Sequence, residues 1–241
     1  MILSGMRSVL AAVGRRPDLW CVLVLCGGAL AVRLAFSTRA DVFATKDSFE
    51  YFQPAFNLAN GLSFDLALRR PPIYSLFAAG VMWLFGESLA AVAFAQHVLG
   101  VITVGLAYWL GRLTFGRLAG LLAGLLVALD SVLILYEHYV LSEPLFTLVL
   151  LGACLTFVVA LRRDTTSWYV LAGLALGLAV LTRPVAQSIL LAVPPALLIQ
   201  RGGLRGAWKP TLLVLAAAGL LIVPWMARNR LVYGSFSTSG Q

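Results

Sequence analysis

Long apolar blocks, separated by short polar or basic turns, run along nearly the whole chain. A helix that spans the hydrocarbon core of a membrane needs about 20 mostly apolar residues, with a range of about 17–25, so each block is a candidate transmembrane helix. The blocks cover residues 19–36, 71–86, 88–111, 118–136, 143–162, 167–183, 185–200 and 210–227. This pattern predicts an all-α, polytopic membrane protein. The composition agrees, because 61% of the residues are hydrophobic and only 12% are charged, about half the charged share of an average soluble protein.

The block 71–86 decides the topology, because it is short, begins with Pro71-Pro72 and ends at Gly86. If it lies at the outer surface instead of crossing, the three later basic clusters fall on the same side as the N-terminus. Loops rich in Lys and Arg face the cytoplasm, so this arrangement is favoured. The three clusters are Arg112 with Arg117, Arg162 with Arg163, and Arg201 with Arg205 and Lys209.

We therefore predict about seven transmembrane helices in a single transmembrane domain over residues 1–241, with a cytoplasmic N-terminus. Residues 37–87 form an outer loop that carries amphipathic and juxtamembrane helices. The blocks 167–183 and 185–200 form either a tight hairpin or a pair of shallow helices. The opening segment can be taken for a signal peptide, but we expect an uncleaved anchor. The net charge of +8 sits in turns between apolar blocks, which indicates a membrane partner and no nucleic acid.

The stretch "KDSFEYFQPAFNLANG", residues 46–61, is unusually polar and aromatic for this chain. It predicts a surface helix over 47–60, with Asp47 or Ser48 as the N-cap, Glu50 completing a capping box, and Gly61 as the stop. Phenylalanines recur along it at helical spacing and would dip into the membrane interface. Asp47 then has two open interpretations, as a helix cap or as a carboxylate that takes a proton from an acceptor hydroxyl.

A second polar group lies in "LDSVLILYEHYVLSEPLF", residues 129–146. Asp130 falls inside an apolar block, where an acid is costly, so we expect it to face the bundle interior or a wet cavity, on the same helix face as Glu137. Glu137 and His138 lie near the outer boundary, and Glu143 precedes Pro144 at the start of the next helix. The predicted topology places Asp47, Glu50, Glu137 and Glu143 on the same side of the membrane.

Arginines share that side of the membrane. They are Arg69 and Arg70 before Pro71, Arg183 after an apolar helix, and Arg228 and Arg230 in "PWMARNRLVYG". Either they anchor the chain to lipid headgroups or they bind a phosphate attached to a lipid, because Arg makes bidentate contacts with phosphate. Acids beside arginines suit one reaction in particular, in which a carboxylate deprotonates an acceptor hydroxyl and cations hold the leaving phosphate of a lipid-linked sugar.

The order of motifs resembles the GT-C glycosyltransferases, in particular the dolichyl-phosphate-mannose protein mannosyltransferases and the lipid A aminoarabinose transferases. The motifs that carry the resemblance are "RLAF" 33–36, "DSFEYFQPAFNLANG" 47–61, "RPPIYSLFAAGVMWLFG" 70–86, "LSEPLFTLVLL" 141–151, "GLALGLAVLTRP" 173–184 and "PWMARN" 224–229. The resemblance implies the transfer of a sugar from a polyprenyl-phosphate donor to a hydroxyl of a lipid, glycan or protein. It places this reaction on the outer, periplasmic face of a bacterial inner membrane.

The resemblance also implies roles for individual residues. Asp47 stands where the family has its catalytic acid, and Ser48 replaces the second acid common there, which leaves Glu50 as a substitute. Glu143 matches the acid of the second outer loop. The candidate substrate-binding residues are Tyr51, Arg70, Tyr74, Glu137, His138, Arg183 and Arg228.

Some features depart from the family or stay open. No metal-ligand spacing is present, although a divalent metal could still take part. Family members have more spans than this chain, so it is either a fragment or a subunit whose partner chain supplies further helices. A membrane transporter and a non-catalytic lipid-binding subunit are the rival functions.

Overall fold

A computed structural model describes residues 16–62 and 70–239 of the chain. The described residues form only helices and the turns that join them. The helices are α2 (Arg16–Ser37), α3 (Lys46–Ala59), α4 (Pro72–Phe85), α5 (Leu89–Phe115), α6 (Arg117–Leu129), α7 (Ser131–His138), α8 (Glu143–Arg163), α9 (Thr166–Thr182), α10 (Ala186–Arg201) and α11 (Leu204–Tyr233). The first residues of the predicted anchor and Arg69 lie outside the described ranges.

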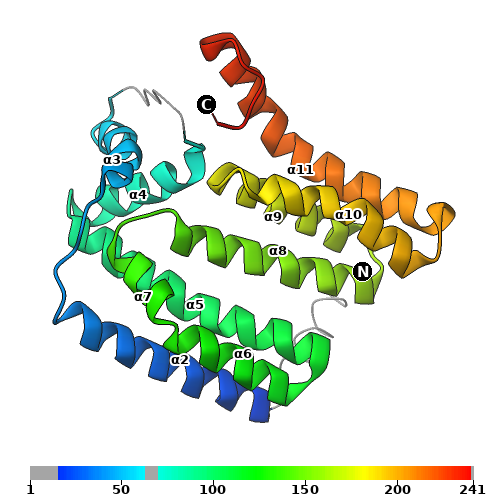
Figure 1. The fold of residues 1–241 in the computed structure, drawn as a ribbon, viewed down its shortest axis with the longest axis horizontal. Helices are drawn as coiled ribbons and strands as arrows, with labels where there is room; N and C mark the ends of the chain where they lie inside the picture. The colour runs from blue at the N-terminus through cyan, green and yellow to red at the C-terminus, as the bar shows by residue number, and fades with distance from the viewer. Residues whose placement is uncertain (1–15, 63–69, 240–241) are drawn as a thin grey trace.

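The long helices run alongside one another, and the turns between them gather at two ends (Figure 1). One end, which we call the site end, carries α3, α4, the turn between α7 and α8, and the turn between α9 and α10. The opposite end carries the turns between α5 and α6, α8 and α9, and α10 and α11. The three basic clusters used to predict the topology border these opposite-end turns, as the sequence pattern requires.

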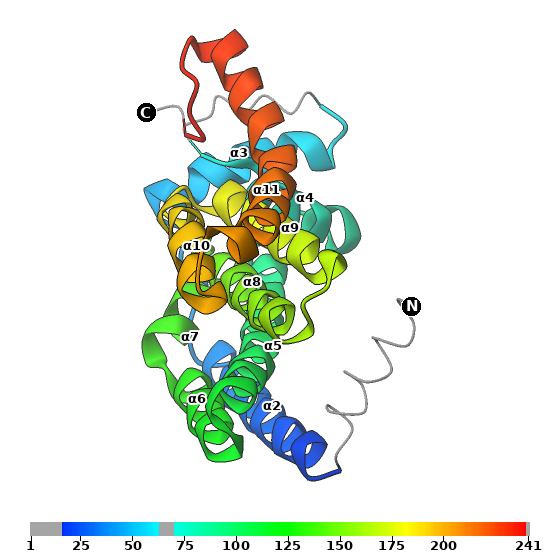
Figure 2. The ribbon, with the colours of Figure 1, turned by 90° about the vertical axis from the view of Figure 1, so that its right-hand side faces the viewer.

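The helices pack in two groups. Helix α5 contacts α2, α6 and α7, and it also contacts α8, which leads into the second group of α8, α9, α10 and α11 (Figure 2). Small residues let some of these helices approach closely. A β-carbon added at Gly173 of α9 would lie 2.4 Å from the carbonyl oxygen of Val214 on α11. Close backbone approach through small residues is how helices associate without water to drive them together.

In the part of the chain that the structure describes, four helices are long and apolar enough to cross a membrane, and α6 with α7 makes a fifth if the bent pair is one span. The four are α2 from Pro17, α5, α8 and α11. Helices α9 and α10 have 17 and 16 residues and fall short of that length. Helix α4 has 14 residues, or about 21 Å of rise against roughly 30 Å of hydrocarbon. The chain is thus a helical integral membrane protein, and the count of seven spans stays a prediction.

The block 118–136 is not one straight helix, and the prediction that Asp130 faces the bundle interior is wrong. The helix breaks at Asp130, and α6 and α7 meet there at a bend of 47°. The exposed carboxylate of Asp130 accepts hydrogen bonds from the backbone N–H groups of Val132 and Leu133, at 2.9 and 3.1 Å. Asp130 is therefore the exposed N-cap of α7, whereas Glu137 on the same helix is buried.

At the opposite end, Asp18 of α2 holds three elements together. Its carboxylate is fully buried, and it accepts hydrogen bonds from the Tyr108 hydroxyl at 2.7 Å and from the Nε atoms of Arg112 and Arg117 at 3.2 and 2.9 Å. Two arginines that serve as topology signals in the sequence are therefore also ion-pair partners. The contacts tie α2 to α5 and to the first turn of α6.

Candidate active site

Helix α3 carries the first candidate residues at the site end, and its start differs from the predicted one. Thr45, not Asp47 or Ser48, is the N-cap, and Ser48, not Glu50, completes the capping box. The Thr45 hydroxyl accepts from the Ser48 N–H at 3.3 Å, and the Ser48 hydroxyl accepts from the Thr45 N–H at 2.9 Å. The carboxylates of Asp47 and Glu50 are therefore not used in capping.

Arg70 bridges these two carboxylates. Its Nη2 lies 3.0 Å from Oδ1 of Asp47, and its Nε donates to Oε2 of Glu50 at 2.8 Å. The side chain of Asp47 is 55% exposed, so one face of its carboxylate remains open to a reactant. Partial burial lowers the pKa of Arg70, but the hydrogen bond to Glu50 and the negative charges nearby raise it above the ordinary value. The guanidinium stays charged and orients both acids.

A second acid–arginine pair lies at the start of α8. Glu143 occupies the first turn, next to Pro144, and forms an ion pair with Nη1 of Arg183. The same nitrogen lies 3.5 Å from the Ser142 hydroxyl oxygen. Arg183 follows α9 in an extended conformation, which is the backbone favoured before a proline such as Pro184. Both Glu143 and Arg183 are about one third exposed.

Tyr51 connects the two acid–arginine pairs. The guanidinium carbon of Arg70 lies 5.5 Å from the Tyr51 ring centroid, within the range of a cation–π contact. The Tyr51 hydroxyl lies 3.1 Å from the Ser142 hydroxyl. Its ring packs edge-on against Tyr74, with centroids 4.8 Å apart, and the Tyr74 hydroxyl donates to Gln96. The structure thus brings six predicted residues into one polar line: Asp47, Glu50, Arg70, Tyr51, Arg183 and Glu143.

Of the remaining predicted residues, Tyr74 is fully buried, and the other three lie elsewhere. Arg228 is on α11, and its guanidinium carbon lies 4.9 and 5.5 Å from the rings of Trp225 and Tyr233. Glu137 and His138 are each only 2% exposed. The polar atoms of both side chains are taken up by other protein groups, so neither is presented at the surface with the polar line.

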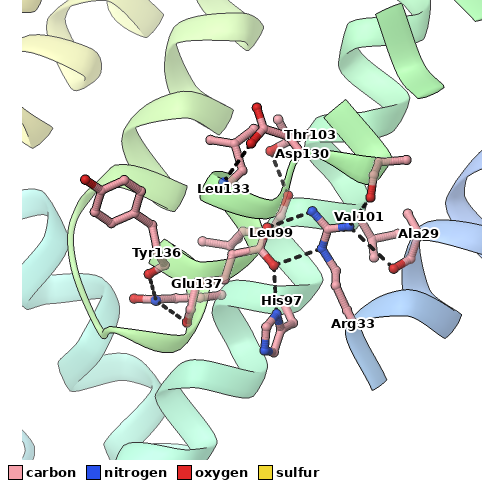
Figure 3. A network of polar contacts seen from close by, with 12 residues as sticks. Ala29, Arg33, His97, Leu99, Val101, Thr103, Asp130, Leu133, Tyr136 and Glu137 are labelled. Atoms are coloured by element: carbon pink, nitrogen blue, oxygen red, sulfur yellow. Dashed lines mark hydrogen bonds and ion pairs between the residues drawn. The ribbon is translucent and has the colours of Figure 1, made fainter. Parts of the chain in front are cut away.

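Figure 3 shows the network of polar contacts around the buried carboxylate of Glu137. Arg33 of α2 donates from Nε and Nη2 to the two carboxylate oxygens, at 2.8 and 2.7 Å, and Nδ1 of His97 on α5 lies 2.7 Å from Oε2. Arg33, Gln96 and His97 were not predicted as site residues. The available signal was their position, because each is a polar residue within an apolar helix, where such residues are costly unless paired.

A metal site does not follow from these contacts. Within residues 16–62 and 70–239, no three His, Cys, Asp or Glu side chains come close enough to hold an ion. Arg70 already occupies the position between Asp47 and Glu50.

Comparisons with known proteins agree with the resemblance. The family model described as dolichyl-phosphate-mannose-protein mannosyltransferase matches residues 69–227, a range that includes Arg70, Glu143 and Arg183 but begins after Asp47 and Glu50. The undecaprenyl phosphate-alpha-4-amino-4-deoxy-L-arabinose arabinosyl transferase of Edwardsiella ictaluri is 29% identical over 155 residues, which are 60% of this chain and 27% of that protein. This chain therefore spans about a quarter of that relative's length.

A solved structure supports the fold. The oligosaccharyltransferase of Archaeoglobus fulgidus, crystallised with a tethered acceptor peptide, superposes with a TM-score of 0.71 at 17% identity. The similarity covers 95% of this chain and 32% of that one. The family model matches well over half of the sequence, and the chain belongs to the dolichyl-phosphate-mannose-protein mannosyltransferase family, within the GT-C class of membrane glycosyltransferases.

Proposed function

We propose that this chain carries the acceptor-activating part of a glycosyltransferase, which moves a sugar from a polyprenyl-phosphate donor to an acceptor hydroxyl at the outer face of a bacterial inner membrane. The observation that carries the proposal is the polar line at the site end. There, a half-exposed carboxylate, Asp47, is oriented by Arg70 and joined through Tyr51 to the Glu143–Arg183 pair. Acids that accept protons and arginines that bind phosphate occupy one end of the molecule.

The chemistry assigned to these residues is a displacement at the anomeric carbon. Asp47 removes the proton of the acceptor hydroxyl, whose oxygen then forms the new bond to the sugar. The bond between the anomeric carbon and the phosphate oxygen breaks, and its electron pair leaves with the lipid phosphate. Arg183 is our candidate for holding that phosphate, because its guanidinium is partly exposed and lies across the polar line from Asp47.

An apolar hollow near the polar line is consistent with a lipid-linked substrate. A space of about 210 Å³ lies between α3 and α4, directly beside Ser48. Phe49, Phe52 and Phe56 of α3 and Met82 of α4 line it. A hydrocarbon chain would replace water at these aromatic rings, which is favourable by about 25 cal/mol per Å² of apolar surface covered.

The test is transfer of a radiolabelled sugar from a polyprenyl-phosphate donor in membranes that contain the protein. Asp47→Asn should abolish transfer and leave membrane insertion intact, because Thr45 provides the cap and an amide cannot take the proton. The matched control is Asp41→Asn, an exposed acid in the same loop, which should keep wild-type turnover. Full turnover with Asp47→Asn would contradict the assignment. Binding of polyprenyl phosphate without any transfer by the wild type would favour the lipid-binding subunit.

A further inference from the structure

The chain has only two histidines, and the structure places them in one buried chain of hydrogen bonds. Nδ1 of His97 lies 2.7 Å from Oε2 of Glu137, and Nε2 of His97 lies 3.0 Å from Nδ1 of His138. Nε2 of His138 lies 2.9 Å from the carbonyl oxygen of Ala40. All four ring nitrogens therefore have one partner each, and each histidine residue is only 2% exposed.

The hydrogen bonds between Glu137 and Ala40 need more hydrogens than two neutral imidazole rings carry. The chain ends in a carboxylate at Glu137 and a backbone carbonyl at Ala40, which both accept hydrogen bonds and donate none. Three contacts of hydrogen-bond length need three hydrogens, but two neutral imidazoles carry only two N–H groups between them. With two neutral rings, one buried contact would bring two lone pairs face to face, which is strongly unfavourable away from water.

The extra proton belongs on the rings rather than on Glu137. The Arg33 guanidinium donates two hydrogen bonds to the Glu137 carboxylate, at 2.8 and 2.7 Å, and such contacts favour the ionised acid. His138 is the last residue of α7, where the negative end of the helix dipole favours a cation. The neighbouring groups are thus arranged for a positive imidazole pair.

We propose that His97 and His138 form a buried proton-binding site that holds one proton more than two neutral rings. Among the described residues, the charged group in direct contact with the pair is Glu137 of α7, which hydrogen-bonds to His97. Arg33 of α2 is linked to the pair indirectly, through its ion pair with Glu137. Phe36 of α2 packs edge-on against the His138 ring at 5.0 Å, and Gln96 beside His97 is neutral. The network then carries two positive charges and one negative charge, with the surplus proton shared by the two rings.

The site bears on catalysis through the segment before α3, a step that rests on the proposed function. His138 donates to Ala40, the N–H of Phe43 donates to the carbonyl of His138 at 3.3 Å, and the Ser48 hydroxyl donates to the carbonyl of Tyr139 at 3.0 Å. Residues 40–48 are thus fastened to residues 138–139 directly around Asp47. Loss of the surplus proton removes the hydrogen from either the Ala40 contact or the contact between the rings. His97 and His138 are therefore positioning residues for Asp47.

The proton count can be measured directly, because ¹⁵N-histidine labelling of the full chain in detergent marks only these two rings. Near neutral pH we expect three protonated ring nitrogens, and raising the pH should remove one. Two protonated nitrogens near neutral pH would overturn the proposal. Glu137→Gln removes the negative charge and supplies an amide that can donate to His97, so its count should fall to two; a count of three would contradict the part of the proposal that assigns retention of the surplus proton to the Glu137 carboxylate. The wild-type count stands even if this variant does not fold.

Positioning is tested separately by hydrogen exchange of residues 40–48 above and below the pH at which the third proton leaves, corrected for intrinsic exchange. We expect exchange to rise by roughly tenfold or more, as expected for a lost charge-assisted bond, while α10 does not respond. Equal protection on both sides of the step would refute the positioning role. Neither measurement requires transferase activity, so either can fail or succeed independently of the proposed function.

Discussion

The hydroxyl oxygens of Tyr51 and Ser142 lie 3.1 Å apart, and this contact joins α3 to the residue directly before Glu143. Both side chains are almost fully buried, at 4% and 1% exposure. The two acid–arginine pairs come from segments about 90 residues apart in the sequence, so their relative position depends on a small number of such contacts.

Tyr51→Phe should therefore reduce sugar transfer without removing any charged group. The net value of one hydrogen bond is about 0.5–1.5 kcal/mol, so we expect a loss of roughly two- to tenfold in turnover. The ring remains against Tyr74, so the unfolding temperature should fall by only a few degrees, about the effect of one hydrogen bond. Tyr136→Phe is the control, because that side chain lies on the exposed side of α7. Equal activity of both variants would show that the contact does not align the pairs.

Arg183 should control the use of the donor. A charge-assisted contact to a bound phosphate is worth about 1.5–3 kcal/mol, so Arg183→Gln should weaken donor use by roughly 10- to 150-fold. Arg183→Lys keeps the charge and can keep the contacts that Nη1 makes with Glu143 and Ser142, but it loses the planar fork that binds a phosphate through two nitrogens, so its loss should be intermediate. The dependence of transfer rate on donor concentration measures both effects. If neither variant changes that dependence, Arg183 anchors headgroups and the phosphate site lies elsewhere.

Gly100 of α5 should tolerate no side chain. A β-carbon there would lie 2.0 Å from Oε1 of Glu137 and 2.7 Å from Nε of Arg33. Gly100→Ala must displace this ion pair, at a cost of about 1–3 kcal/mol for overpacking and about 3–5 kcal/mol if the pair breaks. At Gly105 on the same helix, the nearest atom is Sγ of Cys26 at 3.6 Å. Gly105→Ala should therefore be neutral or slightly stabilising in a thermal unfolding assay in detergent.

The predicted topology can be tested at the turn between α5 and α6. Gly116 has φ +103°, so a cysteine is better placed at its neighbour Phe115, which is 85% exposed. In intact cells, Phe115→Cys should be shielded from a membrane-impermeant thiol reagent, and Asp41→Cys at the site end should react. The wild type, with its three partly buried cysteines, gives the background. The reverse pattern would place the site end in the cytoplasm.

The sequence predicts most helices because apolar blocks and their polar boundaries are local signals. The predicted topology also places Asp47, Arg70, Glu143 and Arg183 on one side of the membrane, because successive spans run in opposite directions and every second loop lies on the same side. The details that it misses depend on local competition. Thr45 is the N-cap because its hydroxyl and the Ser48 hydroxyl, three residues apart, can each accept a backbone hydrogen bond from the other residue. Asp130 interrupts the helix because its carboxylate accepts hydrogen bonds from two backbone N–H groups at the start of α7.

The burial of Glu137 and His138 could not be read from their own segment. Their positions near the end of an apolar block favour the surface, and only partners on α2 and α5 make burial tolerable. Arg33 is 104 residues away from Glu137, and His97 is 40 residues away. No local pattern encodes which distant polar residue will supply the compensating charge.

The same long separations have a consequence for how the protein is made. Among the described helices, α2 leaves the ribosome before the others, and it carries Arg33 and Asp18, which are both fully buried in the finished fold. Asp18 meets Arg112 and Arg117 only 94 and 99 residues later, and Arg33 meets Glu137 after 104 residues. At about 5–20 residues per second, that delay is roughly 5–20 s. During this time Asp18 and Arg33 of α2 lack the partners that they have in the finished fold, so we expect the packing of α2 against α5, α6 and α7 to be completed only after α7 has been made.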